Sequence, residues 1–455
     1  MSVSTSFTGA RGIRYPAPDV ARGLMLLLIA VANVPFWLAF FPDAPAGGSL
    51  DRGWVLVRSL LVDHRAYPLF SILFGFGLMT MLDRGEERHI DARTAELDAR
   101  LPGMPEDVRT GWIEGFAREA RDRSRRLVRR RGWWMLLFGL VHGLVFAGDI
   151  IGAYGLVAVL FAGLLARRAW KTLTALGVAQ VLVMTLALLA SPGASAAGGS
   201  AGSMGDGSIA ALLHWYYPIL SGLMWATATP LIAVLAAVVP CVVIGAALAR
   251  TDLLSRPDLH RPLLGAIGFG GLALAAAGGV PQALADAGFA ASAPSWARAL
   301  HELSGIPGAI GWLALLALLA GPPVEHLGAV RGLLSAIGKR SMTAYIGQTV
   351  LFIAVFASVG LLGARGIGQF SGFLIAVGVW AALAVMCGLL ERAGYVRGPF
   401  ERLLRRAVAL SEIDRPIPPI PAPPAIPADT VPADTVSEGA TERAAAPEGP
   451  MGPRA

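Results

Sequence analysis

Long apolar runs without charge recur along most of this chain, and the first of them constrains the fold most. The run from Leu24 to Phe41 holds a single polar side chain, Asn33, and follows Asp19 and Arg22. A run of this length spans the hydrocarbon core of a bilayer as a helix. Ionisable groups at its mouth and an amide near mid-depth are costly in lipid, so they mark candidate functional residues.

Composition places the whole chain in the membrane class. Of its 455 residues, 55% are hydrophobic and 15% are charged, whereas soluble globular proteins carry about 25% charged residues. The apolar windows predict an all-α, polytopic bundle of about ten transmembrane helices in the lipid bilayer. The predicted spans are 24–42, 66–82, 133–147, 149–166, 172–190, 224–249, 263–280, 307–321, 342–363 and 371–390.

The distribution of Lys and Arg predicts the orientation of these spans. With the N-terminus inside, 33 of the 38 basic residues lie in inner segments. This bias favours both termini in the cytoplasm. The net charge of +7 is then explained by topology and anionic lipid, and no nucleic-acid partner is expected. The outer segments hold only Arg52, Arg58, Arg65, Arg298 and Arg365.

Three parts follow from this reading of the chain. Residues 1–18 form a cytoplasmic N-terminal segment, residues 19–410 the transmembrane domain, and residues 411–455 a Pro/Ala-rich tail whose composition is typical of disorder. Within the domain, the cytoplasmic loop 83–132 mixes Arg with acidic residues and is expected to be helical. Its basic end, residues 129–131, is a stop-transfer anchor or, alternatively, a site for phosphate-bearing ligands.

Polar side chains within or beside the spans form two layers, and these are the candidate site residues. The outer layer comprises His64, Arg65, His142, Asp149 and Tyr154. The inner layer comprises Asp19, Arg22, Arg340, Tyr345, Gln348, Glu401 and Arg402.

His142 is the only histidine well inside a predicted span. At the helical rise it lies about 16 Å beyond Arg131, and Asn33 lies about as far beyond Arg22. We therefore expect the two side chains to meet near the midplane. A neutral imidazole can act as a general base once a carboxylate or carbonyl fixes its tautomer. The alternative for His142 and Asn33 is an interhelical hydrogen bond.

Asp149 follows His142 by seven residues, which is two turns of a straight helix, so we expect no direct contact between them. It is expected instead near His64 or Arg65 at the outer mouth. Metal-ligand spacings, phosphate loops and nucleophile elbows are absent from the sequence. No metal or tightly bound cofactor is therefore expected. Four further histidines fall in predicted loops and are expected at the surface: His89, His260, His301 and His326.

Five motifs in order give the chain a recognisable pattern over about residues 17–408. They are Asp19-x-x-Arg22-Gly23 with Asn33, Leu69 to Gly77, Gly139 to His142 with Gly148 to Tyr154, Gly338 to Gln348, and Gly398 to Arg402 with Arg405. This pattern resembles the domain of unknown function 418 family, the YeiB-like bacterial membrane proteins. Two positions depart from it: Ala344 replaces the usual Asn, and Arg402 replaces a frequent aromatic residue.

The resemblance implies a function, because that family is similar to membrane acyltransferases such as the O-antigen acetylases. Those enzymes take acyl groups from cytoplasmic acyl-CoA and modify a glycan across the membrane with a histidine. The likeness implies an acyltransferase in the bacterial cytoplasmic (inner) membrane, with acyl-CoA as co-substrate and an envelope glycan or lipid as acceptor.

The roles that this likeness implies can be placed on residues of this chain. His142, and after it His64, are the candidates for the catalytic histidine, and Asp149 and Arg65 would shape the acceptor pocket. The donor's phosphates would bind Arg22, Arg340 and Arg402. The alternatives are a transporter or permease for a small organic solute, and a membrane scaffold without catalysis.

Overall fold

The computed structural model describes residues 16–41, 48–190, 212, 214–324, 326–413 and 419–420. Over these ranges the chain forms fourteen α-helices and no β-strand, so the predicted all-α fold is confirmed. The helices are α1 Ala17–Leu38, α2 Ser49–Leu61, α3 Ala66–Arg100, α4 Glu106–Gly143, α5 Ile151–Ala166, α6 Trp170–Ala190, α7 Tyr217–Leu235, α8 Val238–Leu248, α9 Arg261–Asp286, α10 Ser295–Ala320, α11 Ala329–Gly338, α12 Ser341–Leu361, α13 Gln369–Arg392 and α14 Pro399–Leu410.

Eight helices in the described ranges are long and apolar enough to cross a membrane. Three apolar helices are shorter: α5, α8 and α11. The protein is therefore a multi-pass helical bundle, whereas the count of ten spans and the cytoplasmic placement of both termini stay predictions. Most of the predicted end segments, residues 1–18 and 411–455, lie outside the described residues.

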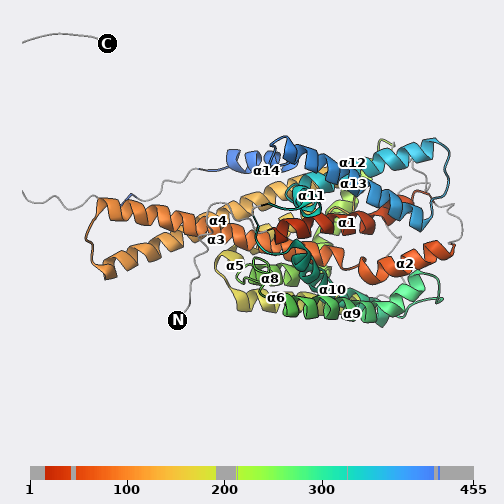
Figure 1. Ribbon diagram of the computed structural model, residues 1–455, viewed down its shortest axis with the longest axis horizontal. Coiled ribbons are helices and arrows are strands. Elements are labelled where there is room, and N and C mark those ends of the chain that lie inside the picture. The colour runs from red at the N-terminus through yellow and green to blue at the C-terminus, as the bar shows by residue number, and fades with distance from the viewer. Residues whose placement is uncertain are drawn as a thin grey trace, which may run out of the picture.

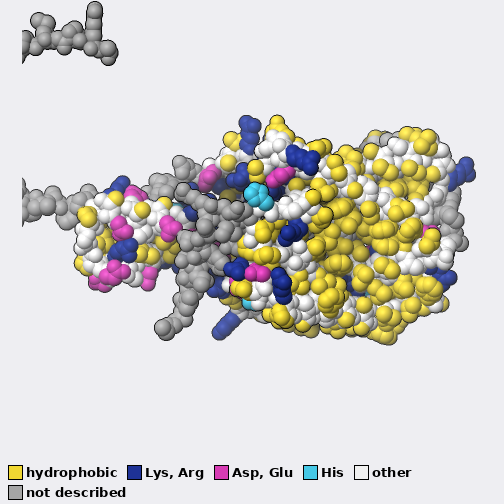
Figure 2. Space-filling view, in the orientation of Figure 1, with side chains coloured by type: hydrophobic (Ala, Val, Ile, Leu, Met, Phe, Trp, Pro, Cys, Tyr) yellow, Lys and Arg dark blue, Asp and Glu magenta, His cyan; other side chains and the backbone are white. Residues whose placement is uncertain are grey.

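The loop predicted over residues 83–132 is helical, because α3 continues to Arg100 and α4 begins at Glu106. The two helices project as a pair beyond the rest of the bundle (Figure 1). Acidic and basic side chains are scattered over this extension, whereas hydrophobic side chains cover most of the visible bundle body (Figure 2). Ion pairs such as Arg109–Asp98, at 3.0 Å, join the two helices of the extension. The extension is thus the water-exposed part of the fold.

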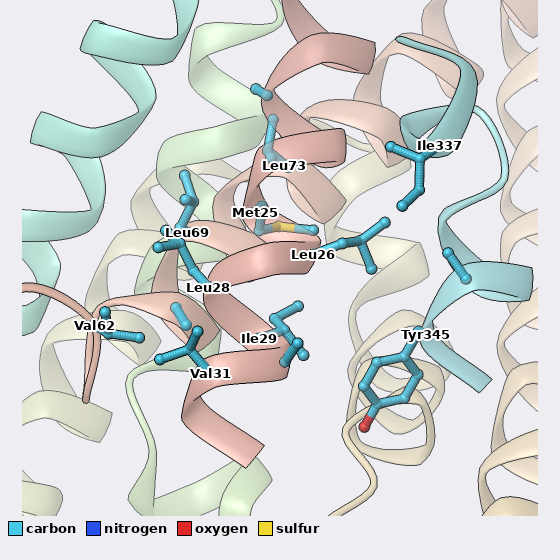
Figure 3. Close-up of a cluster of buried hydrophobic side chains, with 14 of the residues drawn as sticks. Met25, Leu26, Leu28, Ile29, Val31, Val62, Leu69, Leu73, Ile337 and Tyr345 are labelled. Atoms are coloured by element: carbon cyan, nitrogen blue, oxygen red, sulfur yellow. The ribbon is translucent and has the colours of Figure 1, made fainter. Parts of the chain in front are cut away.

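Helix α1 lies at the centre of the bundle, where it contacts α3, α10, α11, α12 and α13. Most of its side chains are buried, as expected for a helix that is apolar on all sides. Figure 3 shows the side chains of α1 packing against residues of α3, α11 and α12. The labelled residues are Met25, Leu26, Leu28, Ile29, Val31, Val62, Leu69, Leu73, Ile337 and Tyr345.

Glycines bring two helix pairs into backbone contact. A Cβ on Gly23 of α1 would lie 2.1 Å from the Leu334 carbonyl oxygen of α11. A Cβ on Gly338 of α11 would lie 1.8 Å from the Asp19 carbonyl oxygen of α1. Each helix therefore has a glycine where the backbone of the other helix approaches it. Gly75 on α3 meets α8 in the same way, at 2.1 Å from the Val242 carbonyl oxygen. The hydrophobic effect does not hold helices together in lipid, so close van der Waals packing at small residues contributes to their association.

The single span predicted over 224–249 is wrong, because the chain breaks there into α7 and α8. Pro240 lies in the first turn of α8 and cannot continue the preceding helix. Gln180 on α6 bonds both broken ends, since its amide nitrogen donates to the Ala233 carbonyl and its oxygen accepts from Val239 N at 2.9 Å. Backbone groups in lipid must find such partners.

Candidate functional site

His142 lies at the end of α4 with both ring nitrogens bonded to side chains. Nδ1 lies 2.8 Å from Oδ1 of Asp149, and Nε2 lies 2.8 Å from the hydroxyl oxygen of Thr349 on α12. The side chains are nearly sealed, at 7% exposure for His142, 0% for Asp149 and 6% for Thr349. We call these three residues the relay centre.

The direct contact between His142 and Asp149 overturns the predicted separation of the two residues. Helix α4 ends at Gly143, and the chain turns back before α5 begins at Ile151. Asp149 therefore folds back onto the last turn of α4, and no straight helix separates it from the imidazole. A Cβ on Gly139 would lie 2.7 Å from Oδ2 of Asp149, so only a glycine leaves room for the carboxylate there.

Asp149 is held as an acceptor on both carboxylate oxygens. Oδ2 accepts from Gly152 N at 2.8 Å and from the Trp225 indole nitrogen at 3.2 Å. An ionised carboxylate suits these donors, so we assign the imidazole proton to Nδ1, facing Asp149. Nε2 is then free to accept the proton of the Thr349 hydroxyl. The arrangement is that of a general base oriented by a carboxylate.

Helix α7 supports the turn that carries Asp149. The Tyr217 hydroxyl donates to the Val145 carbonyl at 3.0 Å, and the Ser221 hydroxyl donates to the Gly143 carbonyl at 2.7 Å. These bonds satisfy carbonyls that the end of α4 leaves without helical partners. The relay centre is therefore fixed from three sides, by α5, α7 and α12.

Asn33 does not meet His142 as predicted, because both imidazole nitrogens have other partners. Helix α1 approaches the α4–α5 turn through aromatic rings instead. Trp37 stacks on Phe146 with ring centroids 5.9 Å apart, and Phe36 meets the same ring edge-on at 4.8 Å. The Tyr345 ring lies edge-on to the imidazole at 5.2 Å. Aromatic side chains thus line the relay centre on the side that faces α1 and α12.

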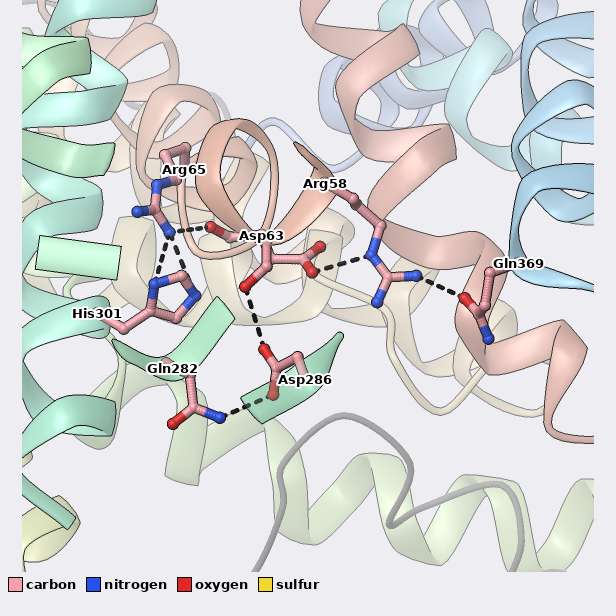
Figure 4. A network of polar contacts seen from close by, with 8 residues as sticks. Arg58, Asp63, Arg65, Gln282, Asp286, His301 and Gln369 are labelled. Carbon is pink, nitrogen blue, oxygen red and sulfur yellow. Dashed lines mark hydrogen bonds and ion pairs between the residues drawn. The ribbon is translucent and has the colours of Figure 1, made fainter. Parts of the chain in front are cut away.

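His64 and Arg65 form a separate centre with His301 and Glu302 of α10, which we call the arginine centre; Figure 4 shows Arg65 beside His301. Arg65 is fully buried, and its Nη1 lies 2.6 Å from the Asp63 carbonyl oxygen and 3.1 Å from His301 Nδ1. Its Nη2 donates to the Ala275 carbonyl at 2.6 Å. His64 adopts a left-handed backbone, with φ of 60°. The expected proximity of Asp149 to these two residues is wrong.

Glu302 joins the arginine centre through contacts that the sequence reading missed. Its carboxylate pairs with His64 Nδ1 and accepts from the Tyr67 hydroxyl. His301, expected at the surface, is 2% exposed, because α10 begins at Ser295 and not near Pro307. The apolar window started too late, since the first turns of α10 carry polar residues that face the protein interior.

Arg58 extends this polar network toward α13. It donates to the Asp63 carboxylate at 2.9 Å and to the Gln369 side chain at 2.8 Å. The hydroxyl of Ser59 donates to Asp286 at 3.0 Å, as part of the network in Figure 4. These bonds tie α2 to α9 and α13, which is a structural task.

The three arginines predicted to bind the donor differ in their partners, although Arg340 and Arg402 both contact Tyr395. Arg340 is fully buried and donates to the Ala336 carbonyl at 2.7 Å, to Glu391 at 2.7 Å and to the Tyr395 carbonyl. Arg402 is exposed, with its guanidinium 5.5 Å from the Tyr395 ring centroid. Arg340 therefore joins α11, α12 and α13 and has few donors left for a ligand.

Glu401 caps a transmembrane helix from a distance. Its Oε1 accepts from the backbone N–H groups of Met342, at 2.7 Å, and Thr343, at 3.0 Å, in the first turn of α12. Its Oε2 accepts from the Thr343 hydroxyl. The carboxylate thus satisfies free N–H groups and complements the positive end of the α12 dipole.

Arg22 and Arg131 both contact α3, at Leu73 and Met81. Arg22 pairs with Asp19 at 3.5 Å and donates to the Leu73 carbonyl at 3.4 Å. Arg131, just before the apolar part of α4, contacts the Met81 sulfur at 3.9 Å. Burial lowers the pKa of the Arg131 guanidinium, and the nearby charges of Arg22 and Arg405 lower it further. The positive charges of Arg22, Arg131 and Arg405 are thus close enough to repel one another.

The two remaining candidates, Gln348 and Tyr154, bond neighbouring helices. Gln348 donates to the Leu26 carbonyl of α1 at 2.8 Å. The Tyr154 hydroxyl lies 3.1 Å from the Tyr67 carbonyl oxygen and 3.1 Å from the Ser71 hydroxyl. Both side chains are buried, and their contacts position α12 against α1 and α5 against α3.

Comparison with known proteins supports the resemblance seen in the motifs. The chain is 25% identical over 428 residues to the uncharacterized protein YxaH of Bacillus subtilis (strain 168), covering 86% of this chain and 94% of that protein. No solved structure matches the chain. Residues 248–411 match the family described as protein of unknown function (DUF418), and the predicted resemblance to that family is thereby confirmed.

Proposed function

We propose that the protein is a membrane acyltransferase in which His142 acts as general base. The observation that supports this is the relay centre itself, in which a carboxylate orients one imidazole nitrogen and a hydroxyl faces the other, each at 2.8 Å. Ionisable side chains inside a membrane are costly, so such an arrangement favours a chemical role. The imidazole would remove the proton from an attacking hydroxyl, a step that contributes about 10²–10⁴-fold in rate.

The acyl donor would be acyl-CoA arriving from the cytoplasm, and the acceptor an envelope glycan or lipid. We assign the donor's phosphates to Arg22, Arg131 and Arg405 in place of Arg340, whose two terminal nitrogens already donate to Ala336, Glu391 and Tyr395. Arg131 forms no ion pair within the described part of the chain, and the Glu401 carboxylate, which is near enough to raise the pKa of its guanidinium, only partly offsets the three positive charges. Guanidinium groups bind phosphates strongly, often through two parallel hydrogen bonds.

The transporter alternative draws on one observation, the break between α7 and α8. Transporters often place a solute against the free backbone groups of such a break. Here Gln180 bonds the carbonyl of Ala233 and the N–H of Val239, so those groups are taken. In the relay centre a hydroxyl faces an imidazole that a carboxylate orients, and because this is the geometry of a general base we prefer acyl transfer.

The test is a comparison of His142→Ala with His260→Ala, purified in detergent and supplied with acetyl-CoA and an envelope extract. His260 pairs with Asp252 far along the chain from the relay centre, which makes it a matched control. We expect release of the CoA thiol by the wild type and by the control. We expect a fall of about 10²-fold or more in the His142 variant. Equal release by the two variants contradicts the proposal.

A further inference from the structure

The hydrogen-bond partner of the Thr349 hydroxyl differs from that of several other hydroxyls within the helices of this protein. Four such groups within the predicted spans bond the carbonyl four residues earlier in their own helix, at 2.7–2.8 Å. Thr349 lies inside α12 but faces His142 Nε2 across to α4. The four comparison residues are Ser71, Thr80, Thr185 and Ser358.

The surroundings of Thr349 are those of an activated nucleophile. A hydroxyl is a weak nucleophile until an adjacent base removes its proton, and the base works best when a third group orients it. His142 is that base, and Asp149 is the orienting carboxylate, held in place by Gly152 N and the Trp225 indole. The negative charge of Asp149 also stabilises the imidazolium that forms when Nε2 gains a proton.

We propose that Thr349 carries the acyl group covalently between donor and acceptor, an inference that rests on the proposed acyltransferase function. The Thr349 oxygen attacks the thioester carbonyl of acyl-CoA, so that a C–O bond forms and the C–S bond breaks. The hydroxyl proton passes to His142 Nε2 and from there to the leaving sulfur, which departs as the CoA thiol.

The second half of the reaction restores the residue. An acceptor hydroxyl attacks the ester carbonyl, the new C–O bond forms, and the bond to Thr349 breaks. His142 takes the acceptor's proton and returns it to the Thr349 oxygen. Atoms and charges balance without an oxidant, a reductant or a metal ion.

The packing around Thr349 suits an ester that must survive until the acceptor arrives. Tyr345 lies one turn before it on α12 and Phe352 one turn after it, and both rings are buried, at 5% and 1% exposure. Exclusion of water from such a site suppresses hydrolysis of a reactive intermediate. A covalent carrier also lets donor and acceptor use the site in turn, so they need not occupy it together.

The experiment measures thiol release from acetyl-CoA in the absence of any acceptor. For the wild type we expect a burst of at most one thiol per protein molecule and an acetyl group on the peptide that contains Thr349. The Thr349→Val variant keeps the side-chain shape and should lose the burst by about 10²-fold or more. Thr349→Ser keeps a hydroxyl and should retain both burst and acetylated peptide.

Thr80→Val is the matched control, because the Thr80 hydroxyl bonds only its own helix, at the Phe76 carbonyl. It should behave as the wild type. Full turnover with an envelope extract by Thr349→Val, without an acetylated peptide in the wild type, overturns the carrier role and leaves the proposed function standing. Absence of thiol release from the wild type, with and without extract, overturns both.

Discussion

The relay centre and the arginine centre each bury a histidine, but the charges facing the two imidazoles have opposite signs. His142 faces the Asp149 carboxylate on one side and a hydroxyl on the other. His301 faces the guanidinium of Arg65, which can only donate. The nitrogen of His301 on that side must therefore be unprotonated, and a second proton there would meet a positive charge.

This difference in charge determines which of the two histidines, His142 or His301, can gain and lose a proton. An anion beside an imidazole stabilises its protonated form, whereas a cation beside it opposes protonation. His142 can thus pass through an imidazolium, and His301 cannot do so at comparable cost. We expect chemistry at the first centre and a fixed helix junction at the second. Four predictions test this division.

The largest effect is expected for Asp149→Asn. The amide keeps the size of the carboxylate but removes the charge that orients and stabilises the imidazole. We expect acyl transfer per folded molecule to fall by about 10²–10⁴-fold with little change in unfolding temperature. Thiol release and thermal unfolding of the same preparation measure both quantities. Retained activity would show that Asp149 serves only the α4–α5 turn.

Arg65→Met should have the next largest effect, and on stability alone. The variant removes donors from the buried carbonyls of Asp63 and Ala275. Bonds from a charged donor contribute about 1.5–3 kcal/mol each, so we expect a loss of roughly 3 kcal/mol in unfolding free energy. Arg365→Met, at an exposed position, is the control. A fall in activity per folded molecule would make the arginine centre a functional site.

A smaller effect is expected when alanine replaces one glycine beside each centre, Gly139 beside Asp149 and Gly305 beside His64. A Cβ at Gly139 would lie 2.4 Å from Gly152 N, and one at Gly305 would lie 2.0 Å from the His64 carbonyl oxygen. Each should destabilise the fold by about 1–3 kcal/mol. Only Gly139→Ala should also reduce activity per folded molecule, because it displaces Asp149.

Gly378→Ala is the control for that pair, since a Cβ there meets nothing within 4 Å. It should stabilise its helix by up to about 1 kcal/mol. Unfolding in detergent and thiol release, measured on all three variants, decide the outcome. Equal loss of activity in Gly139→Ala and Gly305→Ala would remove the functional distinction between the centres.

The smallest effect is expected for Trp225→Phe. This change removes the indole N–H that donates to Asp149 at 3.2 Å while keeping an aromatic ring. A bond worth about 0.5–1.5 kcal/mol corresponds to a rate loss of about twofold to tenfold. The rate of thiol release measures it. An unchanged rate would mean that Gly152 N and His142 alone hold the carboxylate.

Much of the fold could be predicted from the sequence, because lipid imposes helices wherever apolar runs are long enough. The position of His142 inside the bundle was also predictable from the sequence, and its side chain is 7% exposed. The contact of His142 with Asp149 escaped prediction because residues 144–150 leave the helical path, and a helical rise cannot describe a turn. The break at Ala236 and Ala237 was hidden in one apolar window for the same reason.

No pattern in the sequence marks the other members of the two centres. Thr349 is one hydroxyl among several in the spans, and only the crossing of α12 with α4 sets it apart. His301 and Glu302 fall before the apolar part of α10, in a segment whose composition resembles a loop. Long-range contacts of this kind depend on tertiary packing, which periodicity and composition do not encode.

The bonds from α7 to the turn after α4 also bear on the order in which the chain folds during synthesis. The Gly143 and Val145 carbonyls obtain their donors from Ser221 and Tyr217, more than seventy residues later in the chain. Until α7 has been synthesised, neither oxygen can have the donor that it has in the folded protein. The turn that carries Asp149 therefore completes its hydrogen bonds only after α7 has been made.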